Sequence, residues 1–462
     1  MNYVTQISRY LFIILVVLFA LRDYTYFSKK NDDKKRKIEN RQLFDIYAFL
    51  VFGFVIVFVN TKNAYYLLLM VAMCVYLALT VGLYRLFYPK ASMLLVNNML
   101  MLLVIGFVMI SRLDISQGFK QFLIAAGATV IAFIIPVIIR KLRVLQKLTW
   151  LYAFLGIMCL MVVFALAAVS GGAKLSITIA GVTFQLSEIV KITFVFFVAA
   201  KLSSDTSRKS IITATVVAVI HVGILVMSTD LGTALVFFVT YLVMLFVATR
   251  NAAWPLAGLG AGCAAAVGSY YIFGHVRKRV AAWKDPFSVY ETSGYQIVQG
   301  LFAIGAGGWF GTGLCCGSPS SIPVASKDYI FAAICEEFGT IFGICLILVC
   351  MSMFLLIVNI SMKIKKPFYK MIAMGLGAEY AFQVFLTIGG VMKFIPLTGI
   401  TLPLVSYGGS SVMSSIIMLA IIQGLYILRN DEEGEELEKK QQNEIECAGK
   451  KFRSKNKQKK RS

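Results

Sequence analysis

The segment IPVASKDYIFAAICEEFG, residues 322–339, joins the longest polar loop of the chain to a long apolar run. Asp328 lies where the loop meets the expected helix, and Glu336 and Glu337 follow within three turns. Inserting a charged side chain at the centre of a membrane helix costs about 2.5–3.5 kcal/mol or more of free energy. A carboxylate at the edge of the membrane therefore calls for a structural or functional explanation. The residues alone leave two interpretations of Asp328 open: a cap of the helix N-terminus, or a catalytic or substrate-binding group.

The apolar runs around this segment indicate the fold class. The chain has 462 residues, of which 59% are hydrophobic and 15% are charged. Continuous runs near the roughly 20 residues that cross a bilayer predict an all-α, polytopic membrane protein rather than a β-barrel. The first run is interpreted as a membrane helix and not as a cleaved signal peptide. The thirteen predicted spans are 7–26, 43–60, 64–88, 94–112, 118–139, 147–169, 185–202, 209–228, 231–249, 253–274, 328–358, 370–394 and 403–428.

The distribution of basic residues predicts the orientation. The net charge is +22, and Lys and Arg gather in the C-terminal tail and in every second loop between the predicted spans. These loops all fall on one side of the membrane. The positive-inside rule places these loops in the cytoplasm, which accounts for the charge without a nucleic-acid partner. The N-terminus and the loop 275–327 are then outside, and the C-terminus is inside. The tail 430–462 has an acidic block followed by a basic one, and we predict it to be disordered.

Paired charges open the helix expected at 185–202. Gln185 begins it, and Glu188 and Lys191 are three residues apart, so they share one face and can pair. Two interpretations stay open, an ion pair that fixes helix packing and a pair that contacts substrate. Asp230 opens a later helix and is interpreted mainly as an N-cap.

Two further segments fall outside the membrane in this topology. Arg277 and Arg279 lie near Trp283, and such residues suit either a substrate with phosphate and sugar parts or anchoring at the interface. The segment from Lys393 to Ser411 holds two prolines and three glycines, so it cannot be one straight helix. Irregular backbone at membrane depth is tolerated where it is buried or lines a wet cavity, which predicts a re-entrant or cavity-lining segment.

Three motifs in fixed order resemble the SEDS family (shape, elongation, division and sporulation), whose members include FtsW, RodA and SpoVE. They are FQLSEIVK (184–191), DYIFAAICEEFG (328–339) and PLTGI…PLVSYGGSS (396–411). The resemblance covers about 94–428, or ten of the thirteen predicted helices. It implies three parts: an N-terminal extension with about three helices (1–90), a ten-helix SEDS core (91–429) and the charged tail (430–462).

The resemblance implies an inverting glycosyltransferase that polymerises lipid II on the outer face of the bacterial plasma membrane, with Asp328 as the catalytic base. It implies a class B penicillin-binding protein as partner, together with other membrane proteins of the division or elongation machinery. A flippase of the lipid-linked precursor and a non-catalytic scaffold remain alternatives. Whether the reaction requires a divalent cation stays open, since the sequence contains no cluster of metal ligands that demands one. The residues expected to bind substrate are Gln185, Glu188, Lys191, Arg277, Arg279, Lys393, Ser406, Gly408, Gly409 and Ser410.

Overall fold

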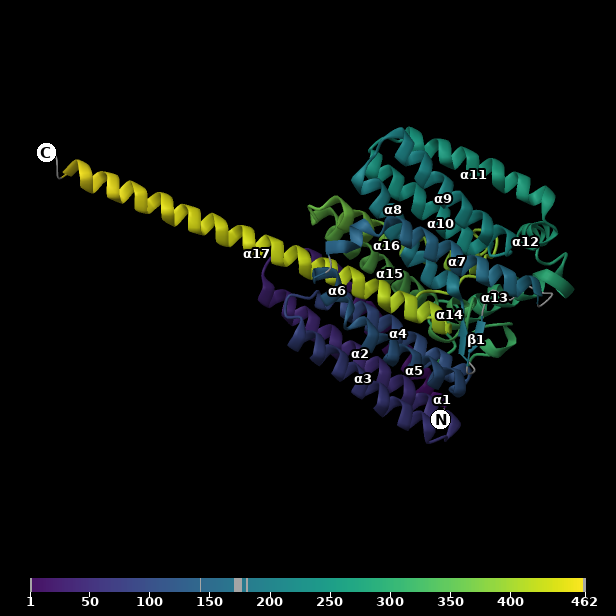
Figure 1. The fold of residues 1–462 in the computed structure, drawn as a ribbon. Helices are drawn as coiled ribbons and strands as arrows, with labels where there is room; N and C mark the ends of the chain where they lie inside the picture. Colours follow the sequence, from purple (N-terminus) through teal and green to yellow (C-terminus); the bar gives the residue numbers. More distant parts are fainter. Residues whose placement is uncertain (1, 142, 170–176, 180–181, 460–462) are drawn as a thin grey trace.

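The computed structural model describes residues 2–141, 143–169, 177–179 and 182–459, and most of them are helical (Figure 1). Two three-residue strands, β1 (Ile177–Ile179) and β2 (Val182–Phe184), pair antiparallel. The α-helices are α1 (Asn2–Phe27), α2 (Asp32–Thr61), α3 (Tyr65–Phe87), α4 (Met93–Leu113), α5 (Ile115–Ala132), α6 (Ile135–Lys141), α7 (Thr149–Val169), α8 (Leu186–Ser204), α9 (Arg208–Met227), α10 (Leu231–Thr249), α11 (Ala253–Ile272), α12 (Gly274–Lys284), α13 (Tyr295–Gly307), α14 (Ile330–Phe338), α15 (Thr340–Lys363), α16 (Pro367–Val391) and α17 (Gly409–Lys459).

Each of the thirteen predicted spans is largely helical in the structure, so the predicted helical membrane fold is confirmed. Within the described residues, ten helical segments are long and apolar enough to cross a membrane, or up to eleven if the bent pair α11–α12 is one span. The other two predicted spans are α7, whose apolar part is the shorter segment Thr149–Ala165, and α8, which carries Glu188, Lys191 and Lys201. These two helices pack against each other and against α9.

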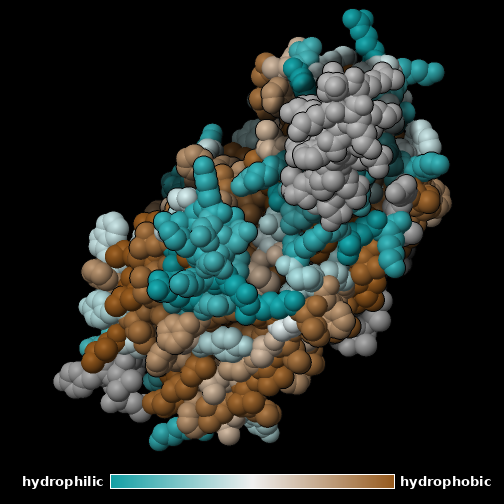
Figure 2. Space-filling model, turned by 90° about the vertical axis from the view of Figure 1, so that its left-hand side faces the viewer, coloured by the Kyte–Doolittle hydropathy of each residue, from teal (hydrophilic) through white to brown (hydrophobic). Residues whose placement is uncertain are grey.

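The end of the bundle at which α17 leaves differs from the sides of the bundle. Viewed from the end at which α17 leaves, hydrophilic side chains gather at the centre and hydrophobic ones flank them (Figure 2). Ion pairs join several loops at this end: Lys90 and Arg140 contact Asp431 at 2.8 and 2.7 Å, and Lys366 contacts Glu432 at 2.5 Å. The loops that the positive-inside rule grouped on one side therefore meet in space, together with the first turns of α17 beyond its apolar part.

The N-terminal helices α1–α3 form one side of the bundle and are fixed to the rest by packing and polar contacts (Figure 1). α1 packs on α2 and α15, and α2 packs on α3 and α4. A chain of buried side chains crosses this contact: Asn97 Nδ2 donates to Gln42 Oε1 at 3.1 Å, and Gln42 Nε2 donates to Asp23 Oδ1 at 2.6 Å. α1, α2 and α4 are thus joined by side chains that are fully withdrawn from solvent.

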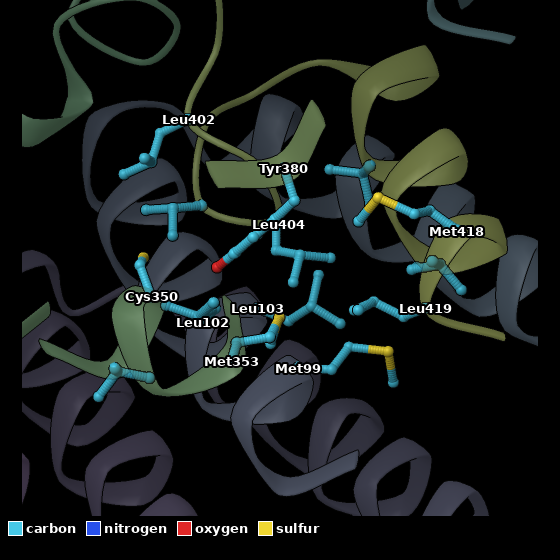
Figure 3. Close-up of a cluster of buried hydrophobic side chains, with 14 of the residues drawn as sticks. Met99, Leu102, Leu103, Cys350, Met353, Tyr380, Leu402, Leu404, Met418 and Leu419 are labelled. Carbon is cyan, nitrogen blue, oxygen red and sulfur yellow. The ribbon is translucent and has the colours of Figure 1, made fainter. Parts of the chain in front are cut away.

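α4 lies at the centre of the molecule, because α2, α5, α15 and α17 surround it. Its residues from Met93 to Ser111 are all buried, and its apolar side chains meet those of α15, α16, α17 and the irregular segment before α17 (Figure 3). The buried side chains labelled there are Met99, Leu102, Leu103, Cys350, Met353, Tyr380, Leu402, Leu404, Met418 and Leu419. Part of the segment 392–408 is therefore packed into the apolar core.

The structure corrects three predicted boundaries. The predicted helix 328–358 is two helices, α14 and α15, which are broken at Gly339, where φ is +92°. The segment 403–408 is not helical, and α17 begins at Gly409. The loop predicted at 275–327 contains most of α12 and all of α13. These are turns and short helices that hydropathy alone does not separate from a long apolar run or a polar loop.

The tail also differs from the prediction. α17 continues to Lys459 and leaves the body of the protein as a single helix (Figure 1), whereas the sequence predicted disorder from residue 430. The physical reason is local: this stretch holds no proline and is rich in Glu, Lys and Gln, which favour helix. Low apolar content predicts that a segment does not join the core, but it does not exclude a helix.

Candidate functional site

Asp328 lies in a turn just before α14. The N-cap position of α14 is Tyr329, and no side-chain cap hydrogen bond is made there. The interpretation of Asp328 as a helix cap is therefore wrong, and its carboxylate is left for another role. The side chain is partly exposed, although Tyr329 and Ile330 directly after it are fully buried.

The neighbours of Asp328 come from α12 and from the segment 392–408. Gly399 has φ +77°, and a Cβ added there would lie 3.7 Å from Asp328 Oδ2. Arg279 Nη1 donates to the carbonyl oxygens of Leu397 and Thr398 at 3.3 and 3.0 Å. Burial raises the pKa of the Asp328 carboxyl above its usual range, while the charges of Lys327 and Arg279 partly lower it. A carboxyl with a raised pKa is a stronger base once it is deprotonated.

Backbone contacts hold the turn that carries Asp328. Ser406 Oγ donates to the carbonyl of Lys327 at 2.6 Å and accepts from the amide of Leu402 at 2.9 Å. The amide of Tyr407 donates to the carbonyl of Ser326 at 2.7 Å. We call this set the Asp328 junction: residues 326–328, Arg279 and the segment 397–408. Ser406 thus lies in the junction but uses its hydroxyl on the protein itself.

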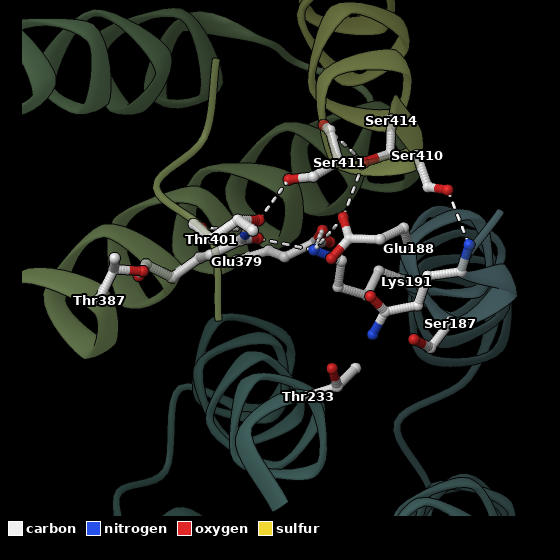
Figure 4. Close-up of polar contacts among 12 residues, drawn as sticks. Ser187, Glu188, Lys191, Thr233, Glu379, Thr387, Thr401, Ser410, Ser411 and Ser414 are labelled. Carbon is white, nitrogen blue, oxygen red and sulfur yellow. Dashed lines mark hydrogen bonds and ion pairs between the residues drawn. The ribbon is translucent and has the colours of Figure 1, made fainter. Parts of the chain in front are cut away.

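A second polar group, the Lys191 cluster, is buried between α8 and α16. Lys191 Nζ lies 3.0 Å from Glu188 Oε2 and 3.5 Å from Glu379 Oε1, and it donates to Gln383 Oε1 at 2.6 Å (Figure 4). Ser414 Oγ on α17 donates to Glu188 Oε2 at 2.9 Å. The predicted pairing of Glu188 with Lys191 is confirmed. A small cavity adjoins the cluster and is lined by residues that include Lys191, Glu379, Gln383 and Ser414.

The segment 392–408 connects the two groups. Gln383 Nε2 donates to the carbonyl of Thr401 at 3.1 Å, and Thr401 Oγ1 donates to Ser411 Oγ at 2.8 Å (Figure 4). Gly399, two residues before Thr401, lies beside Asp328. The two polar groups therefore contact the same short stretch of backbone.

The other predicted site residues lie around this segment. The amide of Gln185 donates to Ser410 Oγ at 2.7 Å, and Gln185 Nε2 donates to Asp230 Oδ2 at 3.3 Å. Asp230 caps α10 by accepting from the amide of Thr233, as predicted. Gly409 is the first residue of α17, and Gly408 donates its amide to Gln121 Oε1 at 3.0 Å. Gln185, Gly408, Gly409 and Ser410 thus lie together where α8 meets the start of α17.

Lys393 and Arg277 are further from these contacts. Lys393 has φ +58° and accepts from Trp283 Nε1 through its carbonyl at 3.1 Å, which ties α12 to the start of the segment 392–408. Arg277 is exposed on α12. Of the two arginines that the sequence singled out, Arg279 belongs to the Asp328 junction, and Arg277 lies two residues away on the solvent side.

Sequence reasoning missed Glu379, Gln383 and Gln121, which hold these groups together. Glu379 is a lone carboxylate in the apolar run 370–394, and that position was itself a signal, because ionisable residues inside membrane segments are expensive. Gln383 follows one helical turn later on the same face. Gln121 gave no comparable signal, since a single glutamine in a helix has no required partner.

The described residues do not build a divalent cation site at Asp328. They contain no group of three or more His, Cys, Asp or Glu side chains with metal-binding geometry. Asp328 is a single carboxylate whose nearest charges, Lys327 and Arg279, are positive. A cation there would need oxygen ligands from a substrate, so no step below depends on one.

Comparison with known proteins identifies the family. A family model of FtsW/RodA/SpoVE cell cycle proteins matches residues 89–430. The chain belongs to this family. RodA of Mycobacterium tuberculosis (strain ATCC 25618 / H37Rv), named a peptidoglycan glycosyltransferase, is 34% identical over 373 residues, which are 73% of this chain and 78% of that protein. Stage V sporulation protein E of Bacillus subtilis (strain 168) is 31% identical over 351 residues, 72% of this chain and 95% of that protein.

Solved structures show the same fold in the FtsW/RodA/SpoVE core. One aligned chain comes from a peptidoglycan synthase complex whose structure concerns the coordination of polymerization and crosslinking. It aligns with a TM-score of 0.60 and 21% identity, and the alignment covers 74% of this chain and 98% of that chain. Thermus thermophilus RodA aligns with a TM-score of 0.55 and 20% identity, covering 73% and 96%. The family model begins at residue 89, so α1–α3 precede the matched region.

Proposed function

We propose that this protein is a peptidoglycan glycosyltransferase that polymerises lipid II, with Asp328 as the general base. The observation that supports this most is the state of Asp328: a carboxyl with a raised pKa, beside an arginine, in a turn that does not use it as a helix cap. RodA of Mycobacterium tuberculosis, at 34% identity, carries the same activity in its name.

In the proposed reaction the Asp328 carboxylate takes the proton from the hydroxyl of the acceptor sugar. The hydroxyl oxygen then bonds to the anomeric carbon of the donor, and the bond from that carbon to undecaprenyl pyrophosphate breaks with inversion. Negative charge develops on the departing pyrophosphate, and our candidates for neutralising that charge are Arg279 and, two residues away on the same helix, Arg277. Lys191 is a weaker candidate for this role, because Glu188 and Glu379 already compensate its charge.

The proposal includes a side of the membrane and a partner. We place the Asp328 junction and the N-terminus outside and the exit of α17 in the cytoplasm, because the end that holds Lys90, Arg140 and Lys366 is rich in basic residues. We propose a class B penicillin-binding protein as partner, since a structural neighbour of this chain comes from a complex that joins polymerisation to crosslinking.

The test is polymerisation of lipid II by purified protein together with the candidate partner. Glycan strands from wild-type protein, absent with Asp328→Asn, are expected. If no strands form but labelled lipid II crosses liposome membranes, the protein is a flippase. If neither occurs with any candidate partner, the scaffold alternative gains. Labelling of a single cysteine at Ser320 in intact cells tests the orientation, and labelling only after lysis would reverse it.

A further inference from the structure

The side-chain amide of Gln121 on α5 makes two hydrogen bonds to the backbone directly before α17. Its Nε2 donates to the carbonyl of Ser406 at 2.8 Å, and its Oε1 accepts from the amide of Gly408 at 3.0 Å. The side chain is fully buried. A primary amide offers one donor group and one acceptor group at this spacing, so both halves of Gln121 are used on one turn.

From this turn the contacts continue to Asp328. Ser406 Oγ donates to the carbonyl of Lys327 at 2.6 Å, and Lys327 directly precedes Asp328. One helical turn before Gln121, on the same face of α5, Gln117 Oε1 accepts from Ser326 Oγ at 2.8 Å. α5 therefore holds the turn before Asp328 directly through Gln117 and indirectly through Gln121 and Ser406.

The backbone at this junction needs such support. Val324 and Leu404 lie beside these contacts on the two segments of the junction, and they have φ +57° and +67°. Non-glycine residues in this region cost about 1–2 kcal/mol each, and such conformations persist where surrounding contacts over-determine them. Without the Gln121 bonds, the amide of Gly408 and the carbonyl of Ser406 would each lose a buried partner, and the segment 397–408 would be held by two fewer hydrogen bonds.

We propose that Gln121 is a positioning residue for Asp328: through Ser406 and Lys327 it fixes the backbone from which the carboxylate reaches the acceptor hydroxyl. Gln121 itself does not touch the carboxylate, so it does not take part in proton transfer. This inference rests on the proposed function of Asp328. It goes beyond that function because it assigns a role in the reaction to a residue of α5, which lies outside the three sequence motifs that carry the family resemblance.

The first experiment measures polymerisation by Gln121→Leu, which keeps the approximate size of the side chain and removes both hydrogen bonds. We expect the maximal rate to fall about 10- to 100-fold, in the range caused by a displaced catalytic group, while the apparent KM for lipid II changes less than twofold. The matched control is Gln423→Leu, because Gln423 is also buried and donates one hydrogen bond, to the carbonyl of Ser92 at 3.2 Å, without any connection to Asp328. The control should keep its rate.

The second experiment uses Gln121→Glu and a pH series. A protonated glutamic acid can donate to Ser406 and accept from Gly408 as the amide does, whereas the carboxylate can only accept. The rate of Gln121→Glu relative to wild type should therefore rise as the pH falls, and the corresponding ratio for Gln121→Leu should stay level. A structural role unrelated to this bond pattern would not produce that difference. The pH dependence of Gln121→Glu also tests the positioning role of Gln121 if Gln121→Leu does not yield folded protein.

The outcomes separate the two proposals. If wild-type protein is active and Asp328→Asn is not, but Gln121→Leu works at the wild-type rate or the Gln121→Glu ratio is independent of pH, the positioning role is wrong and the proposed function stands. If Asp328→Asn is fully active, the proposed function fails, and this inference fails with it.

Discussion

The Asp328 junction and the Lys191 cluster contact the same short segment, but they are held in opposite ways. In the Lys191 cluster, side chains satisfy one another: Lys191 contacts two carboxylates and the Gln383 amide, and all four residues are buried. At the junction, hydrogen bonds to backbone groups hold the turns. Burial raises the pKa of Asp328 and two cations partly lower it, while no hydrogen bond to its carboxylate is found among the described contacts. The comparison teaches that charge inside a membrane protein is not by itself a sign of chemistry. A charge that is paired within the protein stabilises packing, whereas a carboxylate without a direct hydrogen-bond partner is available to a substrate.

The replacement with the largest expected effect is Asp328→Asn. It should lower the rate of lipid II polymerisation by about 10²–10⁴-fold, because the amide cannot accept the proton of the acceptor hydroxyl. The matched control is Asp285→Asn, which changes an exposed aspartate of the same region that contacts only nearby backbone. Equal losses in both variants would show that the effect is not specific to the junction.

Breaking the Lys191 cluster should mainly affect stability. Lys191→Met leaves Glu188 and Glu379 buried without their cation, and removing one partner of a buried ion pair costs about 3–5 kcal/mol. Thermal unfolding in detergent should show a clearly lower midpoint. The triple variant Lys191→Met/Glu188→Gln/Glu379→Gln should recover much of the loss, since no charge is left buried. A triple variant no more stable than Lys191→Met would contradict the account of mutual compensation.

The pH dependence of the reaction sharpens the contrast. A general base works when deprotonated, so activity is lost as the pH falls through the pKa of Asp328, and burial moves that loss to higher pH than for an ordinary aspartate. Arg279 opposes this shift, so Arg279→Ala should raise the pKa of Asp328 and move the acid limb of kcat/KM to still higher pH. Lys278→Ala, an exposed change on the same helix, is the control and should leave the limb in place. A shift of the limb toward lower pH would show that Arg279 does not act on Asp328 in this way.

The smallest expected effect is that of Gly399→Ala. Gly399 has φ +77° beside Asp328, a conformation that costs an alanine about 1–2 kcal/mol, so both the unfolding midpoint and the rate should fall modestly. Gly305→Ala provides the comparison, because Gly305 lies inside α13 and a Cβ added there would meet nothing within 4 Å. A loss in Gly305→Ala as large as that in Gly399→Ala would argue against a special role of the turn.

Much of this protein follows from its sequence by itself. Continuous apolar runs predicted thirteen helices, and the spacing of Glu188 and Lys191 predicted their ion pair, because hydropathy and helical periodicity are local properties of the chain. The motifs around Asp328 predicted the family. The roles of the remaining site residues, Lys393, Ser406 and Ser410 among them, stay predictions.

Only the tertiary structure decided what surrounds these residues. It showed that Tyr329, not Asp328, holds the cap position of α14 and that Gly339 breaks a predicted single helix. It also brought Glu379 to Lys191 and Gln121 to Ser406, pairs that lie far apart in the chain. The physical reason is that burial and hydrogen-bond partners of a side chain depend on which helices pack together, and packing is a property of the whole fold that no local pattern contains.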